Sequence, residues 1–164
     1  MTRRVLGVNA FRRDPAAAIV LDGVPVAAIQ EERLTRKRGE DGFPRRSVRW
    51  CLEQAGCTAQ ELDLVVISEK PLRRFERVLG TQLHGFPRGA GAFASSMFLW
   101  LGDRLWMRGR IAAELEIPAG RVRFVEHARA HAASAAASAE DENLAALVLD
   151  DVGEWAATTL ARVS

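Results

Sequence analysis

The sequence contains no tyrosine, only two cysteines and only 7% aromatic residues, although 48% of its 164 residues are hydrophobic. Much of that hydrophobic content is alanine, which favours closely packed helices. Cys51 and Cys57 lie in a helix-like stretch and its exit, so no structural disulfide is expected and a cytoplasmic location is predicted. The longest uncharged run, Gly89 to Gly102, is too short to cross a bilayer, so no membrane association is expected. The basic N-terminus lacks the apolar run and cleavage site of a secretory signal.

The length is sufficient for about one domain. The formal net charge of +2 is unevenly spread. Residues 1–50 hold eleven Arg and Lys against six Asp and Glu, a net +5, whereas residues 115–164 hold four against eight, a net −4. This asymmetry suggests an anion site near the start and a metal site near the end, or else an unevenly charged solvated surface. No RNA- or DNA-binding motif occurs, and +2 is modest for nucleic-acid binding, so nucleic acid is not the expected partner.

Hydrophobic periodicity predicts an opening meander of three antiparallel strands. These are expected at Arg4–Asn9, Ala16–Leu21 and Val24–Gln30, with a type I′ turn at Asp22-Gly23. A loop or short helix is expected over residues 31–42, followed by a helix over residues 44–55.

Strands alternate with helices through the remainder of the sequence. Strands are predicted at residues 62–68, 121–126 and 143–150, and a further one beginning at Glu154; helices are predicted within residues 71–116 and over 127–138. This order indicates an α/β layered domain with a mixed sheet. Phe98, Leu101, Leu105 and Trp106 fall at helical spacing and are predicted to lie in the core.

His127 and His131 are separated by four residues on a predicted helix, which places both imidazoles on one face. That arrangement can chelate a metal ion such as zinc or iron. No glutamate lies between them, so the pair is not the HExxH motif of metalloproteases. Two surface or capping histidines are the simpler alternative.

Asp150 ends a strand that the pattern predicts to be buried. Burying a carboxylate without a partner is costly, so its position suggests a role as a metal ligand or hydrogen-bonding group. Asp151, Gly153 and Glu154 follow in what looks like a tight turn, and such turns surround phosphate and its metal with backbone N–H groups and carboxylates. An ordinary solvated turn is the alternative.

A third cluster is basic. Arg33, Arg36, Lys37 and Arg38 are candidates to bind a phosphate or carboxylate, with Arg12 and Arg13 after the first strand approaching the same anion. The alternative is a surface helix whose cations pair with Glu31 and Glu32.

Several ordered stretches resemble the N-terminal part of the O-carbamoyltransferases, the family of nodulation-factor, cephamycin and tobramycin carbamoylating enzymes. The resemblance covers essentially the whole chain. The matching stretches are Leu6–Phe11 with Asp14, Ala16–Val20, Asp22-Gly23, Gln30–Arg36, Gly42–Pro44, Lys70–Leu72, Phe75–Arg77, Glu126-His127, His131–Ala135, Asp150, Val152–Ala156 and Thr158-Thr159.

The resemblance implies that residues 1–164 form one N-terminal lobe, ribonuclease-H-like in its sheet, of the actin/Hsp70/sugar-kinase-like (ASKHA) fold. It implies carbamoyl phosphate and ATP as donors, a carbamoyl-adenylate intermediate and a small-molecule hydroxyl as acceptor. His127, His131 and Asp150 would then be the metal ligands, with iron or zinc as the ion. The nucleotide would be bound by Asp14, Arg33, Asp151, Gly153 and Glu154, and Arg13, Lys37 and Arg38 would be catalytic.

Some positions depart from the family pattern. Arg13 and Gly39 replace expected histidines, Arg38 replaces a lysine, and Asp151 replaces a glycine. Family members are also several times longer, so a second polypeptide or a C-terminal portion is expected to complete the protein. The isolated chain is expected to be inactive, and the alternative is a degenerate lobe that binds a partner chain or nucleotide without catalysis.

Overall fold

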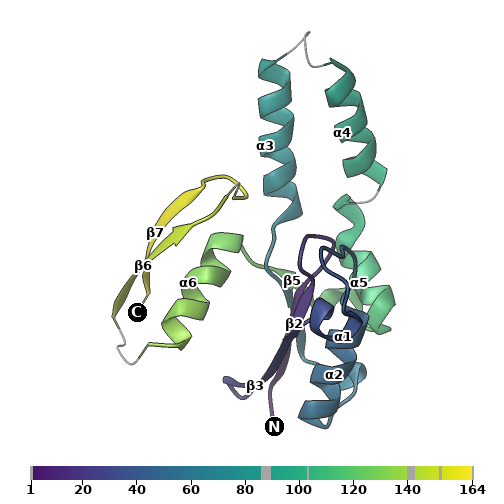
Figure 1. The fold of residues 1–164 in the computed structure, drawn as a ribbon, viewed down its shortest axis with the longest axis vertical. Helices are drawn as coiled ribbons and strands as arrows, with labels where there is room; N and C mark the ends of the chain where they lie inside the picture. Colours follow the sequence, from purple (N-terminus) through teal and green to yellow (C-terminus); the bar gives the residue numbers. More distant parts are fainter. Residues whose placement is uncertain (1, 86–89, 103, 140–142, 152, 164) are drawn as a thin grey trace. The chain divides into compact units, whose positions relative to one another are not determined.

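A computed structural model describes residues 2–85, 90–102, 104–139, 143–151 and 153–163. The chain divides into two compact units. Unit 1 comprises residues 1–68 and 108–124, and unit 2 comprises residues 69–107 and 125–164. The two units are described separately (Figure 1).

Unit 1 is built on a five-stranded mixed sheet. Its strands are β1 (Arg4–Asn9), β2 (Ala16–Leu21), β3 (Val24–Gln30), β4 (Leu64–Ile67) and β5 (Val122–Phe124), in the order β3-β2-β1-β4-β5. Strands β1, β2 and β3 pair antiparallel, whereas β4 runs parallel to β1 and β5 runs parallel to β4. The predicted α/β class and opening meander are confirmed.

The local chemistry of the meander explains its turns. Asp22 and Gly23 both have positive φ values, 49° and 85°, as the predicted type I′ turn requires. Pro25 cannot donate a ladder hydrogen bond, and it lies in the edge strand β3 where the register with β2 shifts.

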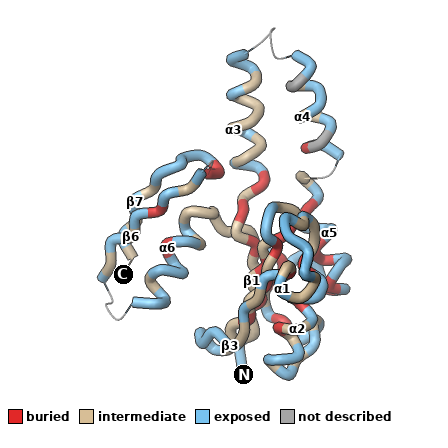
Figure 2. Tube along the Cα trace, in the orientation of Figure 1, coloured by how far each residue is buried: buried red, intermediate tan, exposed pale blue. Residues whose placement is uncertain are grey.

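The core of unit 1 lies on one face of the sheet. Alternate residues of β1, β2 and β4 are buried, such as Leu6, Ile19 and Val65, each 0% exposed. Helix α2 (Arg45–Ala55) packs on β2 and β3, and Cys51 is fully buried in α2. Figure 2 shows buried residues along these strands. The remaining elements of unit 1 are α1 (Glu31–Thr35), η1 (Ala59–Glu61), η3 (Ala119–Arg121) and most of α5 (Met107–Leu115).

The start of α2 is capped from a distance. Its N-cap residue, Pro44, offers no side-chain acceptor. The buried carboxylate of Glu31 supplies two instead: Oε1 accepts from the backbone N–H of Arg46 at 3.0 Å, and Oε2 accepts from the N–H and hydroxyl of Ser47, both at 2.7 Å. These bonds satisfy helix N–H groups that would otherwise lack partners. They also fix α1 against α2.

Unit 2 contains helices α3 (Pro71–His84), α4 (Ala90–Gly102) and α6 (His127–Ala137), the short η2 (Arg104–Trp106), and a two-stranded antiparallel sheet. That sheet pairs β6 (Leu144–Leu149) with β7 (Thr158–Val163), and α6 packs on both strands.

Three sequence expectations are wrong in unit 2. Strand β6 is not a buried strand, since Leu147 and Leu149 are 62% and 72% exposed. The last strand begins at Thr158 rather than Glu154, because residues 153–157 form a turn that starts with Gly153 at a φ of +61°. Phe98, Leu101 and Trp106 are not core residues, since they are 85%, 58% and 67% exposed. Helical spacing identifies a shared face, but it does not say whether the chain itself covers that face.

The predicted break between α3 and α4 falls partly on residues 86–89, which lie outside the described residues. No helix in the described part of the chain combines the length and the apolar character needed to cross a membrane.

Candidate functional site

The two predicted histidine ligands face one another on α6. Their Nε2 atoms are 3.1 Å apart, and their rings meet edge to face with centroids separated by 4.5 Å. Two nitrogens that bind one zinc ion at about 2.0–2.1 Å in tetrahedral geometry lie roughly 3.4 Å apart. The separation in α6 is therefore close to the one that a shared metal ion requires.

The third predicted ligand, Asp150, directly follows β6. Oδ2 of Asp150 lies 3.5 Å from Nε2 of His127, and both side chains are about four-fifths buried. The backbone N–H of Asp150 donates to the carbonyl of Ala157 at 2.8 Å, which holds the strand end in place. Asp150 and His131 thus both lie beside the same atom of His127.

These three side chains form two close pairs rather than a closed triad. Among the residues that the structure describes, no group of three or more His, Cys, Asp or Glu side chains is arranged as a metal site. The donor set of two imidazoles and one carboxylate nevertheless suits zinc or iron. The ligand role of these residues remains a prediction that the pair distances fit.

Sequence reasoning gave Glu126 no role of its own. Its carboxylate forms ion pairs with Arg73 of α3 and with Arg129, whose Nε lies 3.1 Å from Oε2. Glu126 immediately precedes His127, so these ion pairs fix the start of α6 and with it the histidine. The sequence signal for this role was the position of Glu126 directly before the histidine pair, at the start of the predicted helix.

The two acidic residues of the loop between β6 and β7 that sequence analysis singled out, Asp151 and Glu154, differ in burial. Asp151 is exposed. Glu154 is only 6% exposed, and its Oε1 accepts from the backbone N–H of Lys70 at 2.6 Å, so it anchors the start of α3. Its second oxygen, Oε2, is buried and has no hydrogen-bond partner in the described structure.

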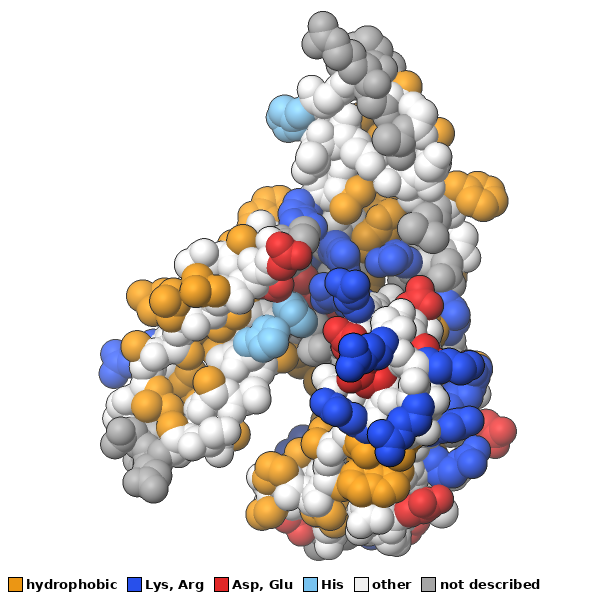
Figure 3. Space-filling view, in the orientation of Figure 1, with side chains coloured by type: hydrophobic (Ala, Val, Ile, Leu, Met, Phe, Trp, Pro, Cys, Tyr) orange, Lys and Arg blue, Asp and Glu red, His pale blue; other side chains and the backbone are white. Residues whose placement is uncertain are grey.

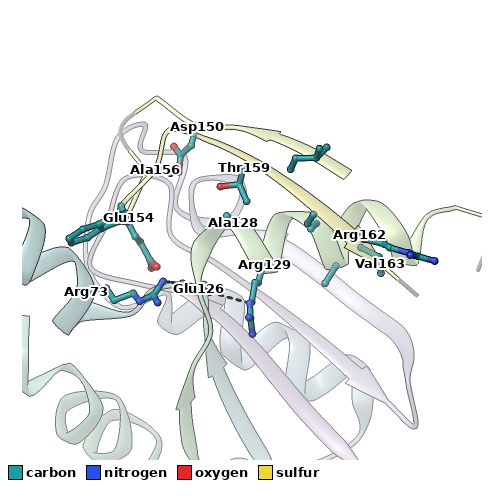
Figure 4. Close-up of a pocket in the computed structure, with 16 residues that line it drawn as sticks. Arg73, Glu126, Ala128, Arg129, Asp150, Glu154, Ala156, Thr159, Arg162 and Val163 are labelled. Atoms are coloured by element: carbon teal, nitrogen blue, oxygen red, sulfur yellow. Dashed lines mark ion pairs between the residues drawn. The ribbon is translucent and has the colours of Figure 1, made fainter. Parts of the chain in front are cut away.

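A cavity of about 630 Å³ lies within unit 2, and Figure 4 shows the residues that line it. Asp150 and Glu154 line it from the β6–β7 loop, and Arg73, Glu126 and Arg129 line it from α3 and α6. Figure 4 shows the ion pairs that join Glu126 to Arg73 and Arg129. The lining of this cavity therefore includes Asp150 and carries positively and negatively charged side chains in similar number.

The predicted basic residues belong to unit 1, where lysine and arginine side chains gather on the face shown in Figure 3. Arg13, Arg33, Lys37 and Arg38 are exposed, as is the predicted nucleotide-binding residue Asp14.

The structure brings the loop after β1 and the segment after α1 together. The backbone N–H of Phe11 donates to the carbonyl of Gly42 at 2.8 Å, and that of Glu31 donates to Pro15 at 2.8 Å. Nδ2 of Asn9 donates to the carbonyl of Asp14 at 2.8 Å. Arg13 and Lys37 therefore lie on two loops that are bonded to each other at the backbone.

The loop after β1 is strained. Phe11 and Asp14 have φ values of 58° and 59°, a conformation that non-glycine residues rarely adopt and that clusters at functional sites. A cavity of about 350 Å³ adjoins it, with Pro15, Glu31, Lys37, Phe43 and Arg46 among its lining residues. Glu40 and Asp41 also line this cavity, so carboxylates balance the cations there, and the anion-binding role of these loops stays a prediction.

Comparisons with known proteins match nearly the whole length of the chain. A family model described as "Carbamoyltransferase N-terminus" matches residues 4–163. The "Uncharacterized protein sll1178" of Synechocystis sp. is 42% identical over 165 residues, which cover 95% of this chain and 26% of that protein. "Nodulation protein NolNO" of Sinorhizobium fredii is 34% identical over 158 residues, which cover 93% of this chain and 22% of that protein.

The chain thus spans about a quarter of the length of these curated relatives. Among solved structures, YeaZ from Pseudomonas aeruginosa is similar over 92% of this chain and 56% of that chain, with a TM-score of 0.45 and 16% sequence identity.

Proposed function

The chain belongs to the carbamoyltransferase family, whose N-terminal part it matches, and we propose that it forms the metal- and nucleotide-binding lobe of an O-carbamoyltransferase. The reaction would move a carbamoyl group from carbamoyl phosphate, through carbamoyl-adenylate, to a hydroxyl of a small molecule. The approach of Asp150 and His131 to the same Nε2 atom of His127 is the observation that best supports this proposal.

His127, His131 and Asp150 would hold the metal ion, iron or zinc. Such an ion supplies Lewis-acid stabilisation of negative charge that develops on phosphate or carbonyl oxygen. Glu126 keeps His127 in position through its ion pairs with Arg73 and Arg129. Asp150 contributes negative charge that would help to hold the cation.

The β6–β7 loop would bind the phosphate side of the nucleotide. Gly153 permits a turn in which a side chain is sterically excluded, and such turns expose backbone N–H groups to anions. Asp151 and Glu154 are then suited to contact a hydroxyl or the metal's water shell, because a carboxylate repels phosphate. The single negative charge that Asp151 adds where the family has glycine would weaken phosphate binding.

In unit 1, Arg13, Lys37 and Arg38 would neutralise phosphate or polarise the carbamoyl oxygen, as fixed cations do in other transfer reactions. Asp14 and Arg33 would contact the nucleotide. The exposure of these side chains and the strained, hydrogen-bonded loop that presents Arg13 support this assignment.

The same proposal extends to the fold and location. The strand order β3-β2-β1-β4-β5, with three antiparallel strands followed by two parallel ones, is the order expected for a ribonuclease-H-like lobe of the ASKHA fold. Two cysteines that form no disulfide support a cytoplasmic location. The isolated chain would have little or no turnover, because its relatives are about four times as long.

A second candidate is a degenerate lobe that binds a partner chain or nucleotide without catalysis. Arg13 and Asp151 favour it, since each replaces the residue that the family uses with one of different chemistry.

The experiment uses a chimera in which this chain replaces the matching first quarter of the Synechocystis relative. ATP-dependent transfer of label from radioactive carbamoyl phosphate to a panel of hydroxyl compounds is measured, with the unaltered relative as reference. We expect transfer by the chimera and at least a hundredfold loss on Asp150→Asn, whereas Glu53→Gln, an exposed substitution on α2, has no effect.

An inactive chimera beside an active relative identifies the degenerate lobe. Equal transfer by Asp150→Asn contradicts the proposed site, and transfer by the 164-residue chain alone contradicts the predicted need for the rest of the protein.

A further inference from the structure

Helix α4 contains no charged residue in its sequence AGAFASSMFLWLG, yet much of it faces solvent. Phe98 is 85% exposed and Leu101 is 58% exposed. A surface helix of a globular protein normally turns a polar face to water, and a helix that is apolar on all sides is normally covered. Among the residues that the structure describes, none covers the outer face of α4.

The inner face of α4 is covered by α3. The rings of Phe75 and Trp100 lie 5.7 Å apart at their centroids, and Trp100 is only 4% exposed. Nε2 of Gln82 on α3 donates to Oγ of Ser96 at 2.8 Å. Ser96 and Trp100, four residues apart, therefore define the face turned toward α3.

The exposed residues lie on a different face of α4. Gly91, Ala94, Ser95, Phe98 and Leu101 are all exposed and recur at the spacing of a single helical stripe. We call these five residues the outer stripe. Figure 3 shows hydrophobic side chains standing out from the surface at this helix pair.

Trp106 extends the apolar surface beyond the end of α4. Its indole Nε1 donates to the carbonyl of Leu101 at 2.9 Å, which places the ring beside the outer stripe, and its side chain is 67% exposed. Two aromatic side chains and one leucine thus lie together at one end, while glycine, alanine and serine occupy the other.

This gradient of side-chain size makes the outer stripe complementary to itself. When two copies of α4 cross antiparallel, Phe98 and Leu101 of one copy lie over Gly91 and Ala94 of the other, and Ser95 lies near the two-fold axis. Such a contact is the same on both sides, as a two-fold dimer requires. Because α4 itself is uncharged, the residues of the two outer stripes bring no like charges together.

We propose that the outer stripe and Trp106 form a homodimer interface, in which the α3–α4 pairs of two copies of this chain associate as a four-helix bundle. Two exposed aromatic rings, a leucine and the small residues supply roughly 500 Å² per copy, or about 1,000 Å² in total, the lower limit for a specific interface. An interface at this lower limit is expected to dissociate on dilution, so the dimer should be concentration-dependent. The proposal goes beyond carbamoyl transfer and uses none of the residues assigned to it.

Sedimentation equilibrium of the chain tests the proposal across about 1 to 200 µM. We expect a reversible dimer with twice the 18.0 kDa mass of the chain. Phe98→Glu and Leu101→Glu each weaken the dimer at least about a hundredfold, because each places a charge in a dry contact. Leu160→Glu, at an equally exposed leucine on β7, leaves it unchanged. Circular dichroism checks that every variant remains folded.

A cross-link tests the antiparallel geometry. In a Cys57→Ser background, Ser95→Cys is expected to form a disulfide-linked dimer on mild oxidation, whereas Glu53→Cys, exposed on α2, does not. Cys51 is fully buried and is not expected to form a disulfide under these conditions.

A chain that stays monomeric at 200 µM overturns the proposal. So does a dimer that Leu160→Glu disrupts and Phe98→Glu does not, since the interface then lies on the β6–β7 sheet. A monomer that binds phosphatidylcholine vesicles, and loses that binding on Phe98→Glu, also overturns it and assigns the stripe to a lipid surface.

Discussion

Nε2 of His127 lies 3.5 Å from Oδ2 of Asp150, although one residue begins a helix and the other follows a strand. The same nitrogen is 3.1 Å from Nε2 of His131. Nε2 of His127 therefore lies close both to a histidine of the same helix and to a carboxylate from another part of the fold. This makes His127 the central residue of the candidate metal site.

The first prediction concerns metal binding by the isolated chain. We expect it to bind about one Zn²⁺ or Fe²⁺, and we expect His131→Ala to lower the affinity by at least about a hundredfold because one ligand is lost. Equilibrium dialysis with elemental analysis measures the bound metal.

The matched control is His84→Ala, which removes the exposed histidine of α3 in the same unit and should leave metal binding intact. Equal losses in the two variants would indicate nonspecific binding to imidazole.

The second prediction concerns the turn between β6 and β7. A Cβ on Gly153 would clash with the carbonyl oxygen of Ala156, and the φ of +61° is itself unfavourable for other residues. Gly153→Ala is therefore expected to destabilise the chain by about 1–3 kcal/mol in urea unfolding.

Gly80→Ala is the control for this prediction. A Cβ at Gly80 meets no atom within 4 Å, and alanine favours the helix α3, so this variant should be slightly more stable than wild type. A Gly153→Ala variant as stable as wild type would mean that the turn adopts another conformation.

The third prediction concerns Glu31. Glu31→Ala removes the acceptors for the N–H groups of Arg46 and Ser47 and leaves buried donors without partners, so it should cost about 2 kcal/mol or more. Glu32→Ala, whose carboxylate only approaches Arg33 at 4.0 Å, should change stability by less than about 0.5 kcal/mol. Chemical unfolding of both variants measures the difference, and equal stabilities would show that Glu31 does not cap α2.

The fourth prediction concerns the thiols. Burial raises the pKa of the Cys51 thiol, and burial also raises the pKa of Cys57, an effect that Arg4 partly opposes. Because the thiolate is the reactive form and Cys51 is fully buried, we expect one thiol per chain to react with Ellman's reagent at pH 8 and two after denaturation.

The reaction of the native chain should accelerate as the pH rises, since more of the Cys57 thiol is then ionised. Cys57→Ser should abolish it. Two thiols reacting at one rate in the native chain would contradict the buried position of Cys51.

Much of the local structure follows from the sequence alone. Alternating apolar residues and the Asp22-Gly23 turn determine the opening meander, because strand periodicity and a type I′ turn are both local properties. The spacing of His127 and His131 likewise determines that they share a helix face.

The tertiary structure decided the rest. Glu31 caps a helix that begins fourteen positions later along the chain, Glu154 anchors the start of α3 from the β6–β7 loop, and Asp150 reaches His127. Hydrophobic periodicity also could not predict that Phe98 and Leu101 are exposed. It indicates which residues share a face of the helix, but not whether another segment covers that face. The physical reason is that backbone preferences act between near neighbours, whereas burial and side-chain pairing depend on segments that only folding brings together.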